Sequence, residues 1–320
     1  MLFLYLALSV LSLALLALLT AHICYRMVFY SKKRVPLGED EYDVPTGKGY
    51  DEKREELISW VKKKRALHHR DISVASFDGL TLRGKYYEYR PGAPIEILFH
   101  GYRGNAERDL SGAIERCFLI GRNALIVDQR AAGSSDGKVI SFGINECRDC
   151  PVWVDKVIEL FGSDVEIILA GISMGAATVT MASAKPLPSN VKYVIADCGY
   201  TSPEKIIRKV CREMHLPDKI LYPFIKLGAR IFGGFDLEAD SSEIAVKSGR
   251  LPIIFFHGEA DDFVPPEMSR SLFELCTAPK KLVTVKNAVH GLAFPEDKEL
   301  YIGALKEFEK ENSIFNNVNK

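Results

Sequence analysis

Residues 166–184 read EIILAGISMGAATVTMASA. The apolar run at 166–170 predicts a buried strand, and residues 176–184 have the composition of a helix. Between them lies a G-x-S-x-G turn at 171–175. Such a turn forces its serine into a strained conformation with an exposed hydroxyl, and a Cβ at either glycine would collide with neighbouring backbone. The motif also arises by chance, so the strand–turn–helix context is what makes Ser173 a candidate nucleophile.

A nucleophilic serine needs a general base and a third group that orients the base. Three histidines follow Ser173 in the sequence: His215, His257 and His290. His290 lies in a loop just past the last predicted strand and is the predicted base. His215 belongs to an insertion, and His257 ends a strand in front of a glycine, which indicates a structural role.

The orienting carboxylate is expected between the serine and the histidine, at the C-terminal end of an intervening strand. Residues 257–265 fill that place, and Glu259, Asp261 and Asp262 compete for the role. The expected order along the chain is the nucleophile, Asp261 and then the base.

Negative charge that develops on a substrate oxygen requires hydrogen-bond donors that are already in place. The backbone N–H of Met174 is the first after the nucleophile and lies at a predicted helix start. The loop after the strand at 95–99 supplies the second candidate, the backbone N–H of Tyr102. In this loop His100 is expected to fix the backbone by hydrogen bonds. Arg103 is expected at the surface, with a clamp for a substrate carboxylate as the alternative.

Strand-like runs alternate with helix-length segments from Ile72 onward. Continuous apolar strands separated by helices predict a mostly parallel sheet covered on both faces. A hairpin with an Asp-Gly turn at 73–87 is expected at the N-terminal edge of this sheet. Residues 197–251 are too long for a simple crossover and predict a helical insertion that serves as a lid. The buried runs fall at 95–99, 124–127, 166–170, 193–196, 252–256 and 281–285.

Five motifs in a fixed order resemble the α/β-hydrolase superfamily over roughly residues 72–308. Within it, the chain is similar to the serine aminopeptidase S33-like group of membrane-anchored bacterial hydrolases. The resemblance implies an α/β-hydrolase fold: a mostly parallel central sheet with helices on both faces, a lid insertion at about 199–250 and an N-terminal transmembrane helix. The motifs are His100-Gly101-Tyr102, D-x-R-x-x-G-x-S at 128–135, G-x-S-x-G at 171–175, H-G-x-x-D-x-x-V-P at 257–265, and His290-Gly291.

The resemblance also separates the competing acids. In H-G-x-x-D-x-x-V-P the acid is the fifth residue, which selects Asp261 over Asp262. Asp128 and Arg130 of the second motif are expected to be structural partners near the site.

These residues predict acyl transfer by a Ser–His–Asp triad without a metal or an organic cofactor. A carboxylic ester or thioester is the expected substrate, and the apolar insertion favours a lipophilic acyl group. A serine aminopeptidase is the alternative enzyme, for which Glu238, Asp240 and Glu243 are candidates to hold a substrate ammonium group. A catalytically silent, membrane-anchored interaction module is the alternative from another class, but such a module would normally lack a triad member.

Composition excludes other classes of partner and site. Lys and Arg number 42, as do Asp and Glu, and phosphate binding would require a basic surplus, so a nucleic-acid partner is excluded. The seven cysteines are odd in number and indicate no disulfide framework. Cys147 and Cys150 form a lone C-x-x-C, so buried thiols in a reducing compartment are expected instead of a zinc site.

The segment from Met1 to Tyr25 carries no charged side chain. About 20 apolar helical residues cross a hydrocarbon core of about 30 Å, so residues 1–30 predict a single-pass membrane anchor. A cleaved signal peptide is the alternative, but the segment lacks a basic n-region and a small-residue cleavage site. Basic residues follow the span and none precedes it, which predicts a cytoplasmic hydrolase domain. These are Arg26, Lys32, Lys33 and Arg34.

The predicted organisation has three parts: an anchor at 1–30, a linker with a short amphipathic helix at 31–70, and a hydrolase domain at 71–320. The expected partners are a small-molecule or lipid-like acyl substrate and the membrane. Because the candidate triad lies wholly beyond Ile72, removal of residues 1–30 is expected to leave a soluble, active hydrolase.

Overall fold

A single central sheet dominates the computed structural model, which describes residues 1–32, 38, 40–47 and 49–315. Lys33 and Arg34 of the predicted basic cluster lie outside these residues. The strands follow the spatial order β1-β2-β4-β3-β5-β6-β7-β8. They are β1 (Arg70–Ala75), β2 (Thr81–Tyr87), β3 (Ile95–Phe99), β4 (Asn123–Asp128), β5 (Ile167–Ile172), β6 (Val191–Asp197), β7 (Ile253–Gly258) and β8 (Lys280–Val285).

The sheet is parallel from β4 to β8, and the antiparallel hairpin β1–β2 forms one edge, as predicted. The register aligns the ends of the central strands: Phe99 lies opposite Gly171, and Gly171 opposite Ala196, which in turn pairs with Phe255. Because these strands end at the same edge, the loops that follow β3, β5, β6, β7 and β8 lie close together. The candidate site residues fall in these loops.

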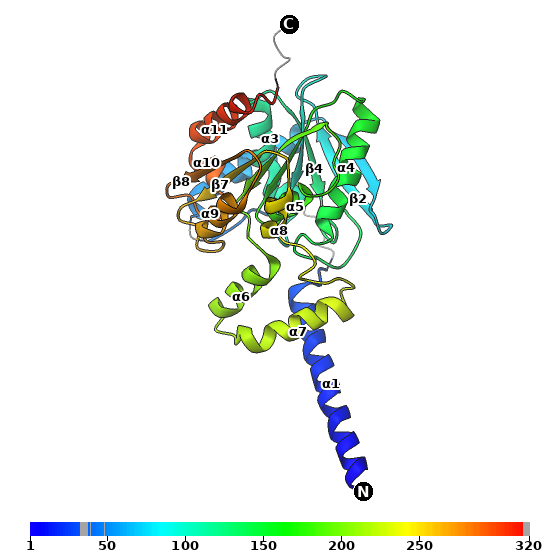
Figure 1. Cartoon of the computed structure of the whole chain (residues 1–320). Helices are drawn as coiled ribbons and strands as arrows, with labels where there is room; N and C mark the ends of the chain where they lie inside the picture. The colour runs from blue at the N-terminus through cyan, green and yellow to red at the C-terminus, as the bar shows by residue number, and fades with distance from the viewer. Residues whose placement is uncertain (33–37, 39, 48, 316–320) are drawn as a thin grey trace.

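Helices cover both faces of the sheet (Figure 1). One buried cluster joins α4, α5, α8 and α9 to the sheet, and the other joins α2, α3, α10 and α11. Ile97 and Leu169 point into the first cluster, whereas Leu98 and Ile168 point into the second. This alternation along strands buried on both faces explains their continuous apolar sequence. The short helix η1 (Asp51–Lys53) directly precedes α2 in sequence. The helices of the two clusters are α2 (Arg54–Ala66), α3 (Ala106–Leu119), α4 (Glu146–Phe161), α5 (Met174–Ala182), α8 (Ser242–Ser248), α9 (Pro266–Leu275), α10 (Ala293–Glu296) and α11 (Lys298–Glu311).

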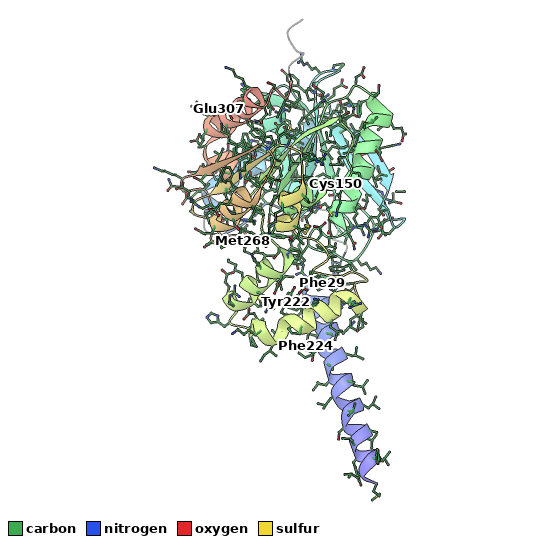
Figure 2. All side chains as sticks on the ribbon, viewed as in Figure 1. Phe29, Cys150, Tyr222, Phe224, Met268 and Glu307 are labelled. Atoms are coloured by element: carbon green, nitrogen blue, oxygen red, sulfur yellow. The ribbon has the colours of Figure 1, made fainter. Side chains whose placement is uncertain are left out.

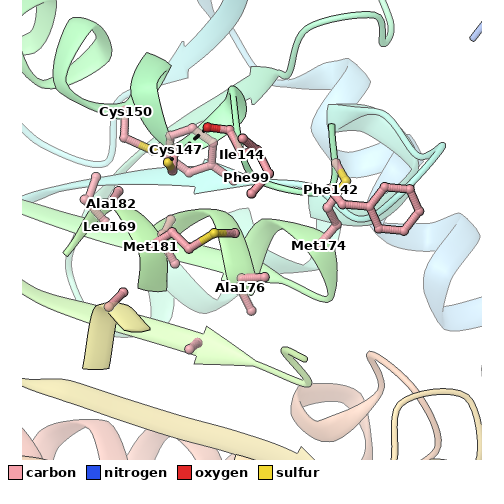
Figure 3. Close-up of a cluster of buried hydrophobic side chains, with 14 of the residues drawn as sticks. Phe99, Phe142, Ile144, Cys147, Cys150, Leu169, Met174, Ala176, Met181 and Ala182 are labelled. Atoms are coloured by element: carbon pink, nitrogen blue, oxygen red, sulfur yellow. Dashed lines mark hydrogen bonds between the residues drawn. The ribbon is translucent and has the colours of Figure 1, made fainter. Parts of the chain in front are cut away.

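The first cluster packs the helix that starts at the G-x-S-x-G turn against the sheet and α4 (Figure 3). Met174 and Met181 of α5 are buried there, beside Phe99 of β3. Cys147 and Cys150 of α4 are buried in the same cluster, and their thiols donate to the carbonyls of Ile144 and Glu146. All seven cysteines are buried and unpaired, as the sequence predicted for the C-x-x-C pair.

The predicted insertion between β6 and β7 contains two helices below the sheet, α6 (Pro203–Glu213) and α7 (Asp218–Ile231), followed by α8. Ser202 caps α6 by accepting from the Lys205 N–H, and Pro203 occupies the first turn, where it leaves no intrahelical bond unmade. Figure 1 shows α6 and α7 between the hydrolase domain and the long N-terminal helix α1 (Leu2–Val28).

Helix α1 is long and apolar enough to cross a membrane, and its length and composition fit a signal sequence equally. The part of α1 from Leu2 to Leu19 is mostly exposed, whereas Ala21, Cys24 and Tyr25 are buried. The buried part crosses α7 at Gly228, where a Cβ would lie 2.4 Å from the Ala21 carbonyl oxygen. Glycine therefore permits the close approach of the two helices.

The end of the predicted anchor belongs to the hydrolase core. Phe29 is wholly buried, with edge-to-face contacts to Phe142 and Phe235. Tyr30 forms an antiparallel bridge with Val139. The expectation that removal of residues 1–30 leaves a soluble, active hydrolase stays a prediction, and the burial of Phe29 argues against it.

Candidate active site

The turn between β5 and α5 has the strained geometry that the motif predicts. Ser173 has φ 56° and ψ −116°, and its N–H donates to the Asp197 carbonyl at 2.8 Å. A Cβ on Gly171 would lie 2.2 Å from the Gly175 backbone, and one on Gly175 would lie 2.0 Å from the Phe99 carbonyl oxygen. Both glycines are required, since backbone atoms occupy the space of any side chain.

Three residues far apart in sequence meet at this turn. The Oγ of Ser173 lies 2.8 Å from Nε2 of His290, and Nδ1 of His290 lies 2.7 Å from Oδ2 of Asp261. The carboxylate requires the proton on Nδ1, so Nε2 is free to accept from the serine hydroxyl. The structure thus brings together all three side chains predicted for a triad, in the order of a nucleophile, a base and an orienting acid.

Asp261 is held as a carboxylate by its surroundings. Its Oδ1 accepts from the backbone N–H groups of Phe263 and Val264 at 3.0 and 2.8 Å. Burial alone would raise the pKa of Asp261, but hydrogen bonds from His257, His290 and the Val264 N–H, with the charge of His290, lower it to about 2. The group therefore stays ionised at neutral pH.

The competing acids point elsewhere. Asp262 is exposed, and its backbone carbonyl accepts from Lys209 of α6. Glu259 accepts from the Thr284 hydroxyl at the surface. Of the three carboxylates in this loop, Asp261 is the one hydrogen-bonded to His290.

The loop after β3 lies against the nucleophile. A Cβ on Gly101 would lie 3.4 Å from the Ser173 Cβ, and the Gly101 N–H is already bonded to Asp109. The backbone N–H groups of Tyr102 and Met174 have no acceptor among the described residues. These are the two donors predicted to bind an oxyanion, and both remain available for a ligand.

His100 fixes this loop, as predicted. Its Nδ1 lies 2.8 Å from the Gly101 carbonyl oxygen, and its Nε2 accepts from the Gln129 N–H at 3.0 Å. The Gln129 side chain donates in return to the His100 carbonyl. These reciprocal hydrogen bonds between His100 and Gln129 fix the loop that carries the candidate oxyanion donor Tyr102.

Comparisons with known proteins agree with this geometry. The sequence model of the FSH1 serine hydrolase family matches residues 167–299, which include Ser173, Asp261 and His290. The chain is 27% identical to the uncharacterized protein YqkD of Bacillus subtilis strain 168 over 241 residues, which cover 73% of this chain and 77% of YqkD. It is 26% identical to the protein bem46 of Schizosaccharomyces pombe over 293 residues, covering 91% of this chain and 87% of bem46.

Solved structures show the same fold. An esterase from Pyrococcus furiosus superposes with a TM-score of 0.63 at 20% identity, over 89% of this chain and 98% of the esterase. The mouse alpha/beta hydrolase domain-containing protein 10 superposes with a TM-score of 0.56 at 17% identity, over 76% of this chain and 99% of that protein.

The chain has the α/β-hydrolase fold. The family match and the assembled site make it a serine hydrolase. None of these matches tests the narrower resemblance to the serine aminopeptidase S33-like group, which stays a prediction.

The other two histidines that follow Ser173 in sequence lie outside the triad, and His257 has the structural position that was predicted for it. His257 is wholly buried, with Nδ1 2.6 Å from the Ser269 hydroxyl and Nε2 2.8 Å from the Val264 carbonyl oxygen. It thereby holds the loop that carries Asp261. His215 is exposed at the end of α6.

Asp128 and Arg130 hold loops near the site and lie outside the hydrogen-bonded triad. Asp128 accepts from the backbone N–H groups of Ala106 and Ser134. Arg130 is buried and pairs with Asp78 and Asp149. Both residues are structural partners, as predicted.

The three acids proposed for the aminopeptidase alternative do not form a common site. Glu238 pairs with Lys226, Asp240 with Lys185, and Glu243 with Lys205. A lysine of the chain therefore already occupies each carboxylate that was expected to hold a substrate ammonium group.

Two neighbours of His290 were not foreseen from the sequence. The Tyr50 hydroxyl donates to the His290 carbonyl at 2.6 Å, across 240 residues of chain. The Cys198 thiol lies 4.0 Å from Nε2 of His290. Cys198, Asp261 and His290 each offer one atom of a kind that can bind a metal ion, and these three atoms lie within 4.8 Å of one another. No sequence motif links Tyr50 or Cys198 to the triad, because only the fold makes them neighbours.

The loop that carries the candidate oxyanion donor Tyr102 also holds the end of α1. The Tyr102 hydroxyl donates to the Val28 carbonyl at 2.7 Å, and Arg103 donates to the Met27 carbonyl at 2.6 Å. The last carbonyls of a helix lack intrahelical partners, and these two side chains supply them. Arg103 is exposed, as predicted, but its guanidinium contacts the backbone of α1.

Proposed function

We propose that this hydrolase cleaves carboxylic esters or thioesters through an acyl-enzyme on Ser173. The observation that carries the proposal is the hydrogen-bonded chain from Ser173 through His290 to the ionised Asp261. Oγ of Ser173 attacks the substrate carbonyl carbon while its proton moves to Nε2 of His290. The resulting oxyanion accepts hydrogen bonds from the backbone N–H groups of Tyr102 and Met174.

The tetrahedral species collapses when the bond to the leaving group breaks. His290 gives its Nε2 proton to the departing alkoxide or thiolate, which leaves as an alcohol or thiol. Water then attacks the acyl carbon and gives a proton to His290, which returns it to Oγ of Ser173 as the carboxylic acid departs. Asp261 remains a carboxylate throughout and stabilises the transient imidazolium.

The proposed acyl group is lipophilic. Esters and thioesters have leaving groups that demand little of the site, and apolar residues dominate the helix α7 of the insertion. Part of this apolar surface is core, since Tyr222 and Ile225 are buried, but Ile220 and Ile231 are exposed. The exposed part supports a lipophilic ligand or surface close to the site.

Labelling with a fluorophosphonate tests the nucleophile. Wild-type protein is expected to be labelled and Ser173→Ala to stay unlabelled, whereas Ser163→Ala, on an exposed turn, should label like the wild type. Labelling that persists in Ser173→Ala would identify another nucleophile. An unlabelled wild-type protein would favour the silent interaction module.

A substrate panel tests the chemistry. Esters and thioesters of increasing acyl length are compared with aminoacyl peptide amides at equal concentration. We expect turnover of the acyl esters and a preference for longer chains. Preferential cleavage of peptide amides would favour the aminopeptidase alternative.

We also propose that α1 anchors the hydrolase in a membrane with its catalytic domain on the cytoplasmic side. The uncharged span and the basic residues that follow it support this orientation. A protease added to intact cells should leave the domain undigested until the membrane is broken. Digestion in intact cells would place the domain on the other side.

A further inference from the structure

Helix α7 carries apolar residues on two opposite faces. One face is buried against the hydrolase and includes Tyr222, Ile225 and Ala229. The other face, here called the outer stripe, has the spacing of a single helical ridge. Figure 2 shows Tyr222 on the side of α7 toward the hydrolase domain and Phe224 on the side away from it. The outer stripe consists of Ile220, Phe224, Leu227 and Ile231.

The outer stripe leaves apolar surface in contact with solvent at its two ends, whereas Phe224 and Leu227 between them are half-buried and Phe224 packs against the first core cluster. Ile220 is 64% exposed and Ile231 is 49% exposed, although both are large aliphatic side chains. A surface helix normally presents polar residues to water on the face opposite the core. Apolar surface of this kind indicates a contact with something outside the chain.

The position of α7 along α1 identifies that partner. The mostly exposed part of α1 runs from Leu2 to Leu19, which gives about 27 Å of helix. That length matches a hydrocarbon core of about 30 Å. Helix α7 crosses α1 just beyond it, where Gly228 meets Ala21 and where Phe232 packs on His22. If the exposed part of α1 spans a bilayer, α7 lies at the surface of that bilayer.

The charge of the two insertion helices suits the same partner. Residues 203–231 contain seven basic and three acidic side chains, in a chain whose formal net charge is zero. Five of these basic residues pair with carboxylates, whereas Lys219 and Arg230 are exposed on α7, each next to an end residue of the outer stripe. Basic residues beside an apolar helical face are typical of helices that lie on an anionic membrane surface.

The reacting centre lies close to this surface. Lys209 of α6 donates to the Asp262 carbonyl, directly after the candidate acid Asp261. Tyr102 of the oxyanion loop bonds to the last turn of α1. Both the insertion and α1 therefore contact loops that carry candidate site residues.

We propose that the outer stripe of α7 docks on the anionic bilayer that α1 enters, and that the hydrolase takes a lipid-like ester from the facing leaflet. The inference rests on the proposed anchoring and ester hydrolysis. A second copy of the chain is the other possible occupant of an apolar face. The bilayer is favoured because α1 leaves the protein beside this stripe, so the apolar surface continues from one to the other.

Depth measurement tests the docking directly. Full-length Ile220→Cys is labelled with a polarity-sensitive thiol fluorophore and reconstituted in vesicles of phosphatidylcholine and phosphatidylglycerol that contain a quencher on the acyl chains. All native cysteines are buried, so the probe reports the new position. Leu300→Cys, 42% exposed on α11 at the far end of the molecule, is the aqueous control, and Leu11→Cys reports insertion of α1 (Figure 1).

Quenching at positions 11 and 220, but not at 300, is the expected result. Quenching at 11 alone would overturn the docking and leave the anchoring intact. An absence of quenching at both 11 and 220 would overturn the anchoring as well. Protection of the 220 probe that depends on protein concentration and not on lipid would assign the stripe to a second copy and overturn the inference.

Activity tests the consequence for substrate access. The double variant Ile220→Glu, Ile231→Glu should lower turnover of a long-chain ester embedded in the vesicles by about tenfold or more, because charged residues cannot enter the apolar layer. Hydrolysis of a soluble short-chain ester should stay at the wild-type rate, since neither residue belongs to the triad. The matched control Leu300→Glu should change neither reaction.

Equal loss on both substrates would show that the double variant damages the fold, and it would overturn the access role. Unchanged turnover of the embedded ester would also overturn it. An absence of ester hydrolysis in the wild type would refute the proposed function instead, while the depth measurement would still decide the docking.

Discussion

The edge of the sheet that holds Ser173 and the face formed by α1 and α7 differ in what they bury. At the sheet edge, polar groups are buried and hydrogen-bonded. The carboxylate of Asp261, for example, accepts hydrogen bonds from two backbone N–H groups and from His290. On the α1–α7 face, aliphatic groups such as Ile220 and those of α1 are exposed. The first region is complete within the chain, and the second becomes complete only with an apolar partner.

The difference shows how the two regions respond to change. Hydrogen bonds fix distances, so the sheet edge should be sensitive to single atoms. Apolar contact scales with area, so the α1–α7 face should respond to changes in exposed surface and not to exact geometry. Five predictions follow, beginning with the largest effect.

Ser173→Ala should lower kcat by about 10⁶-fold, as loss of the nucleophile does in well-studied triads. The free energy of unfolding should change little, because the Ser173 hydroxyl makes a single hydrogen bond, to Nε2 of His290. Ester kinetics and chemical denaturation measure the two quantities. A large loss of stability would mean that this edge of the sheet is built for folding more than for chemistry.

Asp261→Asn should lower kcat by about 10⁴-fold, because an amide no longer fixes the tautomer of His290. Asp262→Asn is the matched control, since Asp262 is exposed next door, and its effect should be far milder. Steady-state kinetics on a soluble ester compare the two. A larger loss of kcat in Asp262→Asn than in Asp261→Asn would mean that Asp262, and not Asp261, is the acid of the triad.

The exposed part of α1 and Phe29, the residue that follows α1, should behave differently. Phe29→Ala should cost about 3–5 kcal/mol of unfolding free energy, because it empties a wholly buried site in the core. Leu11→Ala, on the exposed part, should be nearly neutral in detergent. Thermal or chemical unfolding of the full chain in micelles measures both.

Truncation applies the same test to whole segments. Removal of residues 1–20 should leave a folded hydrolase, whereas removal of residues 1–30 should lower both stability and activity. The longer cut deletes Phe29 and the carbonyls that bind Tyr102 and Arg103. Equal activity of the two truncated proteins would restore the simple anchor at 1–30.

The smallest effect concerns a buried carboxyl near the site. Burial raises the pKa of Asp197 to about 6, although a hydrogen bond from Tyr301 lowers it. A raised carboxyl pKa adds stability that is present below the unfolded value near 4 and is lost as the pH rises through about 6. Asp197→Asn should therefore remove a fall in unfolding free energy on the order of 2 kcal/mol between pH 4 and 7.

The readout of this prediction is the pH slope, so a constant cost of the amide does not affect it. Asp164→Asn, on an exposed turn, is the matched control and should keep the wild-type slope. If the slope survives in Asp197→Asn, another buried group must be responsible for it.

The sequence by itself determined the features that depend on local pattern. The apolar run before Ser173 and the glycines around it specify a strand, a strained turn and a helix, because period and backbone sterics act over a few residues. The resemblance to the α/β-hydrolase motifs, and not the local pattern, predicted which of three neighbouring acids would face His290. The uncharged stretch at the N-terminus predicted a helix of membrane length for the same local reason.

Only the tertiary structure decided what depends on distant segments. It placed Tyr50 and Cys198 beside His290, and it joined the end of α1 to Tyr102. It also divided α7 into a buried face and an exposed one, although both read as equally apolar in sequence. Burial is a property of packing between elements, and a run of apolar letters does not contain the position of the neighbour that covers it.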